Sequence, residues 1–317
     1  MANERLALAI PTFNRPEILR QNLETMLPEL QAHNIPVYIS DDSTTDETQH
    51  LIETLQERYP GIHYTRNRPG LGHDRNCMAT LGLPDADYIW YLGDSLLILP
   101  GVLVNVLGVL EADYDFVFLN SRIKGAADFS VIPRSSVTPF FEKYAWHLTL
   151  TGVTIYSRKF QEWMRANTHP RMYQNFQQLG MVLEYVYSKP KVFTQAFWFQ
   201  QLAIAHTTQK KKSYWVNHSL SVFAQDWVAL LDAFSDAMGS RTCEAIIRSH
   251  DLNTKVFRLG KLIGLRSLDL LNAAILESHG PSLLRACQLS PRLVRLVAAL
   301  PMPLARAYSK PWWRKQK

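Results

Sequence analysis

The chain has 317 residues, of which 47% are hydrophobic, and it carries a formal net charge of +6 at pH 7. This length and composition suffice for one large domain, or for a medium domain with a smaller one, and they exclude global disorder. The three cysteines are far apart and match no metal-binding spacing, which indicates free thiols in a reducing compartment. The sequence shows neither a signal-peptide pattern nor a run of about 18 apolar residues. We therefore expect a cytoplasmic protein, or a peripheral protein on the inner face of the cytoplasmic membrane.

Up to residue 95 the chain alternates between strand and helix patterns. Short apolar runs predict strands at 5–11, 35–40, 61–67 and 87–93, and amphipathic segments predict helices at 16–33, 46–58 and 74–82. Pro16 suits the first turn of its helix, and Asp46 is expected to cap the second helix. This alternation predicts a mostly parallel sheet flanked by helices, in which ligands bind outside the carboxyl ends of the strands.

Polar residues follow each of these four strands. They are Thr12 to Arg15, Asp41 and Asp42, Arg66 to Arg68 with the Gly70 and Gly72 loop, and Asp94 with Ser95. Because the carboxyl ends of parallel strands meet at one edge of a sheet, we expect these residues to surround a shared site.

The remaining chain divides into a mixed part and a helical part. A helix is predicted at 102–112, strands at 115–122 and 191–201, a loop at 125–140, a strand and helix within 150–164, and a helix at 175–188. Lys210 to Lys212 look like a junction. Beyond them the patterns are helical only, at 215–238, 241–250, 253–278 and 281–299. We predict an α/β domain at 1–205 and a helical region at 206–317.

Four segments in this order resemble the inverting family-2 glycosyltransferases with the GT-A fold: IPTFNRPEIL, a strand ending in DDSTTDET, RNRPGLGHDRN and YIWYLGDSLLILPG. The resemblance is clear over residues 5–105 and looser over 106–205. It implies a Rossmann-like GT-A domain that moves a sugar from a UDP- or dTDP-type donor to a hydroxyl of a glycan acceptor, with inversion. The expected acceptor is a lipid-linked surface polysaccharide. The alternative is a non-catalytic protein of this fold that serves another transferase as a scaffold.

The resemblance suggests roles in nucleotide-sugar binding. Asp42, or its neighbour Asp41, corresponds to the acid that accepts a hydrogen bond from the ring N–H of uracil or thymine, since a carboxylate is an acceptor only. Thr12 corresponds to a residue of the nucleotide pocket, and Arg15 in the same loop is either part of that pocket or a solvated surface cation. Arg75, in GLGHDRN, matches an arginine that can hold a diphosphate with paired hydrogen bonds.

Gly93-Asp94-Ser95 corresponds to the family's DxD motif, which carries two or three acids. Asp94 keeps one acid, whereas Ser95 and Leu96 stand where further acids are expected. In the family one acid orients the donor and another binds Mg²⁺ or Mn²⁺ on the diphosphate. Three readings stay open. Asp94 anchors a metal with help from the diphosphate; the leaving group is neutralised without a metal by Arg66, Arg68, Arg75 or His73; or catalysis has been lost.

An inverting transfer also needs a base that removes the proton of the acceptor hydroxyl. The acidic ED pair that the family carries at a helix start is absent here, and Asn175 and Gln177 stand near its place. Glu184, on the predicted helix, is the candidate by residue type. His169 and Asp128 are the other two.

The positive charge of the chain lies in its C-terminal part. Residues 241–317 contain fourteen Lys and Arg against four acids, a net of +10, whereas the first 240 residues contain 20 against 24, a net of −4. Trp312 and Trp313, with Lys310, Arg314 and Lys315 around them, form a combination favoured at membrane interfaces. We predict binding to an anionic membrane surface; the alternative is a packed helical bundle with solvated charges. No nucleic-acid module is recognisable, so we expect no nucleic acid partner.

Overall fold

The computed structural model describes residues 5–125, 130–167, 171–207 and 217–309. Contacts between residues divide the chain into two compact units. The first comprises the described residues of Met1–Phe140, His147–Tyr173 and Gln177–Lys211, and the second those of Phe141–Trp146, Gln174–Phe176 and Lys212–Lys317. The domain boundary after residue 205 stays a prediction, and the Lys210 to Lys212 junction lies outside the described residues.

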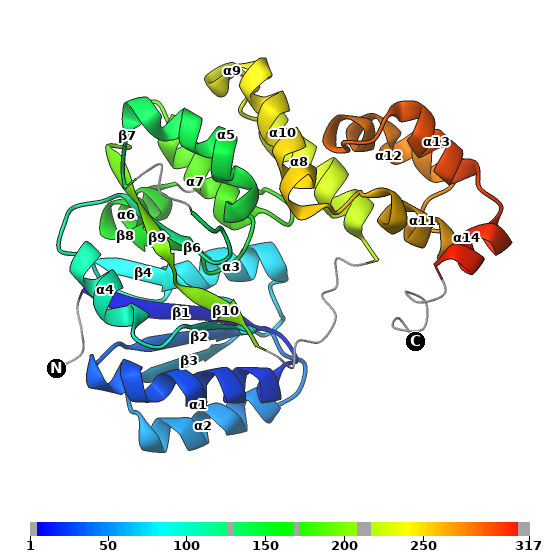
Figure 1. Ribbon diagram of the computed structural model, residues 1–317. Helices are drawn as coiled ribbons and strands as arrows, with labels where there is room; N and C mark the ends of the chain where they lie inside the picture. The colour runs from blue at the N-terminus through cyan, green and yellow to red at the C-terminus, as the bar shows by residue number, and fades with distance from the viewer. Residues whose placement is uncertain (1–4, 126–129, 168–170, 208–216, 310–317) are drawn as a thin grey trace. The chain divides into compact units, whose positions relative to one another are not determined.

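An eight-stranded sheet forms the first unit, in the order β3-β2-β1-β4-β8-β6-β9-β7 (Figure 1). Six strands run parallel to one another, and only β7 and β8 run antiparallel. The bounds are β1 (Leu6–Thr12), β2 (Val37–Asp41), β3 (Ile62–Arg66), β4 (Tyr88–Tyr91), β6 (Phe116–Asn120), β7 (Val131–Pro133), β8 (Thr154–Ser157) and β9 (Gln195–Leu202). The predicted mostly parallel sheet is confirmed.

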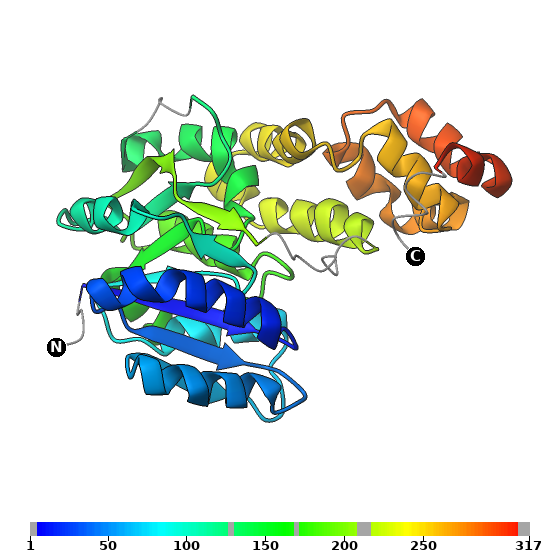
Figure 2. The same ribbon diagram turned by 60° about the horizontal axis from the view of Figure 1, so that its bottom comes forward.

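Helices cover both faces of this sheet. Right-handed connections place α1 (Pro16–Ala32) and α2 (Glu47–Arg58) together on one face, where they contact each other (Figures 1 and 2). The strand order reverses between β3 and β4, so α3 (His73–Gly82) lies on the other face, in contact with α6 (Arg158–Ala166) and α7 (Gln177–Tyr187). This reversal creates a switch point at the carboxyl ends of β1 and β4, where open α/β sheets bind their ligands.

Two parts of the first unit differ from the sequence prediction. The predicted loop at 125–140 is wrong in part, because its described residues include β7, a 3₁₀ turn (Arg134–Ser136) and the start of α5 (Val137–Leu148). β7 has only three residues and ends in a proline, which an edge strand tolerates but which hides the strand pattern. Between β4 and α4 (Val102–Val109) lies β5 (Leu96–Ile98), which pairs antiparallel with the distant β10 (Ile204–His206).

His147, near the end of α5, is a buried histidine of the first unit. It is 0% exposed, its Nε2 lies 3.1 Å from the carbonyl oxygen of Leu119, and its ring meets Trp198 edge-on. Burial lowers the pKa of His147 to about 4. The folded chain therefore holds the neutral imidazole.

We expect the free energy of unfolding to decrease as the pH falls from about 6.5 to about 4, because the unfolded chain takes up a proton on His147 in this window and the folded chain does not. The lowered pKa corresponds to about 3 kcal/mol at most. Urea unfolding of the wild type and of His147→Gln at several pH values measures this term as the difference between the two pH dependences. Equal pH dependences would contradict it.

Within its described residues the second unit is helical, as predicted. Its helices are a π-helical turn (Ser221–Asp226), α8 (Trp227–Asp232), α9 (Ser235–Met238), α10 (Ser240–Thr254), α11 (Leu259–Ser267), α12 (Ala273–Ala286), α13 (Pro291–Ala299) and α14 (Met302–Tyr308). The continuous helix predicted at 253–278 is wrong, because Lys255 takes a left-handed conformation after α10 and Asn272 caps α12. α12 continues past residue 278, with Pro281 inside it. None of the helices in the described ranges has the length and apolarity that a bilayer span requires.

Candidate active site

A buried carboxylate lies just beyond the carboxyl end of β4. Asp94, in the turn between β4 and β5, is 7% exposed. Its Oδ2 accepts a hydrogen bond from the Thr12 hydroxyl at 3.1 Å, and its Oδ1 accepts one from the Arg15 guanidinium at 3.0 Å. The Asn22 side chain donates to the backbone carbonyl of Asp94 at 2.7 Å. Three residues predicted from the sequence, Thr12, Arg15 and Asp94, thus meet at the switch point of the sheet.

The ion pair in this network is graded from buried to exposed. Burial raises the pKa of Asp94, while Arg15 and the hydrogen bonds from Thr12 and the Phe13 backbone offset part of that increase. The Asp94 side chain is 8% exposed and that of Arg15 is 34% exposed. The carboxylate therefore forms the inner side of the pair, and the guanidinium forms the outer side.

Asp42 lies beside the network, directly after β2. Its backbone N–H donates to the carbonyl oxygen of Thr12 at 3.0 Å, so Thr12 is bonded to both aspartates. The Asp42 carboxylate accepts hydrogen bonds from the Asn67 side chain at 2.7 Å and from the backbone N–H of Gly72 at 2.8 Å. Gly72 has a φ of +80°, which favours glycine, and a Cβ at Gly70 would lie 3.4 Å from the Asp42 carbonyl oxygen. The glycine loop is thereby held against Asp42.

The neighbouring acid, Asp41, is enclosed by the protein. It is 0% exposed, and its carboxylate accepts hydrogen bonds from the Tyr64 hydroxyl at 2.7 Å and from the Ser43 N–H at 2.8 Å. Burial and this carboxylate raise the pKa of Tyr64, so the phenol keeps its proton. The sequence left open which aspartate meets a ligand, and the burial of Asp41 favours Asp42.

Two of the cations predicted to neutralise a leaving group are bound elsewhere. Arg66 pairs with Asp46 and donates to the carbonyl oxygens of Ser43 and Thr45, and Arg68 lies 3.1 Å from Asp46. Asp46 makes no capping hydrogen bond at the start of α2, so its predicted role as a cap is wrong. Its carboxylate is engaged by the two arginines instead, which lower the pKa of Asp46.

The other two predicted cations lie on α3. His73 lies 2.9 Å from Asp74, and Arg75 is exposed. Asn76, on the same helix, is 4% exposed and accepts a hydrogen bond from the Ser40 hydroxyl at 2.6 Å, so it packs under the glycine loop as expected.

The residues around Asp94 do not fit a divalent cation. Mg²⁺ and Mn²⁺ need several oxygen ligands, usually more than one carboxylate. Both Asp94 oxygens are occupied by Thr12 and Arg15, and the guanidinium would repel a second cation. Ser95 is half-buried, and its carbonyl oxygen accepts from the Thr207 N–H at 3.1 Å. Searched over the described residues, the chain shows no group of three or more His, Cys, Asp or Glu side chains that could hold a metal ion.

Two amides stand at the start of α7, near the place where a catalytic acid is expected. Gln177 is 0% exposed; its Oε1 accepts from the Tyr173 N–H at 2.8 Å, and its Nε2 donates to the Arg171 carbonyl at 3.2 Å. Gln178 donates to the Thr149 carbonyl at 3.0 Å. Both side chains therefore hold backbone segments in place. In the second unit, Asn175 donates to Asp226 at 2.7 Å.

Glu184 lies seven residues after the start of α7, which is about 10 Å along the helix. The Tyr173 hydroxyl donates to its carboxylate at 3.3 Å, and burial raises the pKa of Glu184. The next residue, Tyr185, donates to Asp115 just before β6. This half of α7 is therefore at the amino ends of the parallel strands, away from Asp94. The other two candidates, Asp128 and His169, lie outside the described residues.

The sequence analysis missed Asn22 and Asn67. Asn22 stands on the apolar stripe of α1, three residues after Leu19 and four before Met26, and a polar residue on such a stripe is a signal that could have identified it. Asn67, in the loop after β3, gives no comparable signal.

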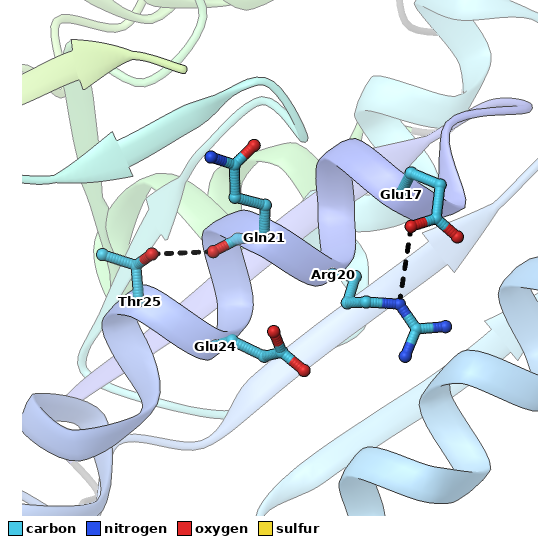
Figure 3. A pocket seen from close by; sticks show the side chains of 5 residues that line it. All are labelled: Glu17, Arg20, Gln21, Glu24 and Thr25. Carbon is cyan, nitrogen blue, oxygen red and sulfur yellow. Dashed lines mark hydrogen bonds and ion pairs between the residues drawn. The ribbon is translucent and has the colours of Figure 1, made fainter. Parts of the chain in front are cut away.

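A surface hollow on α1 is separate from the network. Its lining residues are Glu17, Arg20, Gln21, Glu24 and Thr25, all from one helix (Figure 3). Arg20 lies 3.7 Å from Glu17, and Thr25 donates to the Gln21 carbonyl at 2.7 Å. Two acids against one cation disfavour an anionic ligand, so we assign none to this hollow.

Comparison with known proteins shows two levels of similarity. The family described as Glycosyl transferase family 2 matches residues 7–167. Abequosyltransferase RfbV of Salmonella typhimurium is 36% identical over 122 residues, which cover 38% of this chain and 37% of that protein. A GalNAc(5)-diNAcBac-PP-undecaprenol beta-1,3-glucosyltransferase of Campylobacter jejuni is 24% identical over 127 residues, 40% of this chain and 41% of that protein. The match thus spans less than half the length of either relative.

Solved structures extend the likeness to nearly the whole chain. The crystal structure of S. aureus TarS 1–349 has a TM-score of 0.57 at 10% identity and covers 99% of this chain and 92% of that one. Mannosyltransferase PcManGT from Pyrobaculum calidifontis, in complex with GDP-Man and Mn²⁺, has a TM-score of 0.53 at 13% identity, with 98% and 88% covered. At these identities the likeness concerns the fold alone.

Proposed function

The chain belongs to glycosyl transferase family 2, and from this premise we propose that it transfers a sugar from a nucleoside diphosphate donor to a hydroxyl group of a glycan acceptor. The observation that carries the proposal is the network of Thr12, Arg15 and Asp94 at the switch point of the sheet, with Asp42 bonded to the same Thr12. A site that presents a buried carboxylate and an exposed guanidinium together suits a ligand with both hydroxyl groups and a diphosphate.

The proposed reaction is a single displacement with inversion. The acceptor oxygen forms a bond to the anomeric carbon, the bond from that carbon to the diphosphate oxygen breaks, and the nucleoside diphosphate leaves with the electron pair. A base receives the proton of the acceptor hydroxyl. In this scheme Asp94 orients the donor sugar by accepting hydrogen bonds, and Arg15 stays next to it. Arg75 and Ser95 are the remaining residues assigned to donor binding from the sequence.

A donor of the UDP or dTDP type is favoured by Asp42. A carboxylate has about four lone-pair positions, so Asp42 keeps acceptor capacity beyond its bonds from Asn67 and Gly72. Uracil and thymine present a ring N–H donor to such an acceptor. The names of the two curated relatives include an abequosyltransferase and a glucosyltransferase of an undecaprenol-linked saccharide. We therefore propose a lipid-linked glycan as the acceptor.

The experiment that tests the function is a screen of the purified chain against UDP-, dTDP-, CDP- and GDP-sugars, with thermal stabilisation and donor hydrolysis as readouts. We expect stabilisation and slow hydrolysis by one nucleotide class, and an anomeric configuration of the transferred sugar opposite to that of the donor. A chain that responds to no nucleotide sugar would refute the enzyme and favour a non-catalytic scaffold. A retained configuration would refute the inversion alone.

We also infer that the face formed by α13 and α14 meets an anionic membrane surface. Leu296, Leu304 and Tyr308, exposed by 66%, 59% and 65%, are the most exposed large hydrophobic side chains of the described residues. Residues 288–309 carry three arginines and no acid. Exposed apolar side chains among cations suit the headgroup region of an anionic leaflet. Trp312 and Trp313, which pointed to this partner in the sequence, lie outside the described residues.

Membrane binding should depend on these apolar side chains. The double variant Leu304→Glu with Tyr308→Glu is expected to lower the affinity for phosphatidylglycerol vesicles by roughly tenfold or more, since burial of one such side chain contributes about 1.5–3 kcal/mol. Vesicle sedimentation measures the bound fraction. Leu252→Glu is the matched control, because Leu252 is 54% exposed on α10 and lies outside this face. Equal loss in the control, or unchanged binding of the double variant, would contradict the inference.

A further inference from the structure

We propose that Arg15, held on Asp94, supplies the fixed positive charge that faces the donor diphosphate, so that donor binding by this chain requires no divalent cation. The proposal rests on the proposed function, because it concerns the same site. It deepens that function by naming the residue that neutralises the leaving group.

The position of Arg15 is fixed from two sides. Its backbone carbonyl accepts the hydrogen bond of Leu19, so the residue is locked to the first turn of α1. Its guanidinium is bonded to Asp94, whose backbone and carboxylate are in turn held by Asn22 and Thr12. A charge that is already oriented before the ligand binds costs little reorganisation when a negative charge develops next to it.

The guanidinium has donors left for a ligand. Arginine carries five N–H groups, and Asp94 is the one side-chain partner of Arg15 within the described residues. The Asp94 side chain is almost fully covered, whereas a third of the Arg15 side chain is exposed, so the unused N–H groups face outward. A planar guanidinium can bind a phosphate group with paired hydrogen bonds.

The turn that carries Asp94 explains why a guanidinium stands here. With Ser95 after Asp94, the turn offers a single carboxylate, and one carboxylate is balanced by one monovalent cation. Arg66, the most enclosed cation near the glycine loop, is engaged with Asp46 and with two carbonyl oxygens and is only 10% exposed. Arg15 is therefore the cation that the network itself orients.

The closing experiment measures binding of UDP, dTDP, CDP and GDP by calorimetry, once with Mn²⁺ and once with EDTA. We expect the dissociation constant of the preferred nucleotide to agree within about twofold between the two conditions. Arg15→Gln should raise that constant by about 10- to 100-fold for the diphosphate and much less for the corresponding monophosphate, and Arg15→Lys should recover part of the loss. Arg20→Gln is the matched control, since it removes an equal charge from the exposed side of the same helix.

The outcomes separate this inference from the proposed function. Tight binding that needs Mn²⁺, or an Arg15→Gln variant that binds the diphosphate like the wild type, would overturn the role of Arg15 and leave the transferase standing. Absence of binding by all four nucleotides under both conditions would overturn the proposed function and the inference with it. An equal effect of Arg20→Gln would reduce the result to nonspecific charge and refute the assignment.

Discussion

Asp94→Asn is expected to lower kcat/KM for sugar transfer by about a thousandfold or more, which corresponds to about 4 kcal/mol of transition-state stabilisation. The asparagine side chain is neutral and has one acceptor oxygen, so it cannot hold the Arg15 guanidinium and accept from Thr12 as the carboxylate does. Initial rates with the nucleotide sugar found in the donor screen measure this loss. Activity within tenfold of the wild type would remove Asp94 from the mechanism.

The same variant should keep its fold. Burial raises the pKa of Asp94, so the ionised carboxylate is costlier in the folded chain than in water, and a neutral amide avoids that cost. Thermal unfolding of Asp94→Asn should therefore match or exceed that of the wild type at neutral pH. Asp85→Asn is the matched control, because Asp85 is 82% exposed and pairs with Arg158 outside the network; it should retain full activity. Loss of structure in Asp94→Asn would make its lost activity a folding effect.

Much of the first unit's fold could be predicted because its elements have clear periods. Helices of 10 to 17 residues such as α1, α2 and α3 show an apolar stripe, and buried strands such as β1 and β4 show continuous apolar runs. β5, β7 and β10 have three residues each, too few to show a period. Their place is set by pairing with strands far away in sequence, as β10 with β5, and no local pattern records that pairing.

The candidate site follows the same division. The alternation of strands and helices predicted that Thr12, Asp42 and Asp94 come to one edge, because strand ends meet there. It could not predict which of Asp41 and Asp42 is enclosed, since adjacent residues point in opposite directions and the choice depends on the register with β3. Nor could it pair Arg15 with Asp94 across 79 residues. Such pairing depends on side-chain geometry in the folded sheet.

Asp115→Ala is expected to lower the free energy of unfolding by about 4 kcal/mol, because buried donors that lose their acceptor cost about 1–3 kcal/mol each. Asp115 is 1% exposed, just before β6. Its carboxylate accepts from the Tyr185 hydroxyl at 3.0 Å, from the N–H and hydroxyl of Thr194 at 2.6 and 2.7 Å, and from the Gln195 N–H at 3.2 Å. One side chain thus joins α7 and the start of β9 to β6.

Urea unfolding measures this loss, and two variants show its origin. Tyr185→Phe removes one donor together with its need for a partner, so it should cost only about 1 kcal/mol. Asp113→Ala removes an acid two positions away that is 74% exposed and pairs with Lys159, and it should change stability by less than about 1 kcal/mol. Because Asp115 lies at the amino ends of the strands, the folded fraction of Asp115→Ala should bind nucleotide like the wild type. Asp94→Asn should show the opposite pattern, with stability kept and transfer lost. A variant of Asp115 that loses nucleotide affinity while keeping its stability would place this carboxylate in the site and contradict the division between the two edges of the sheet.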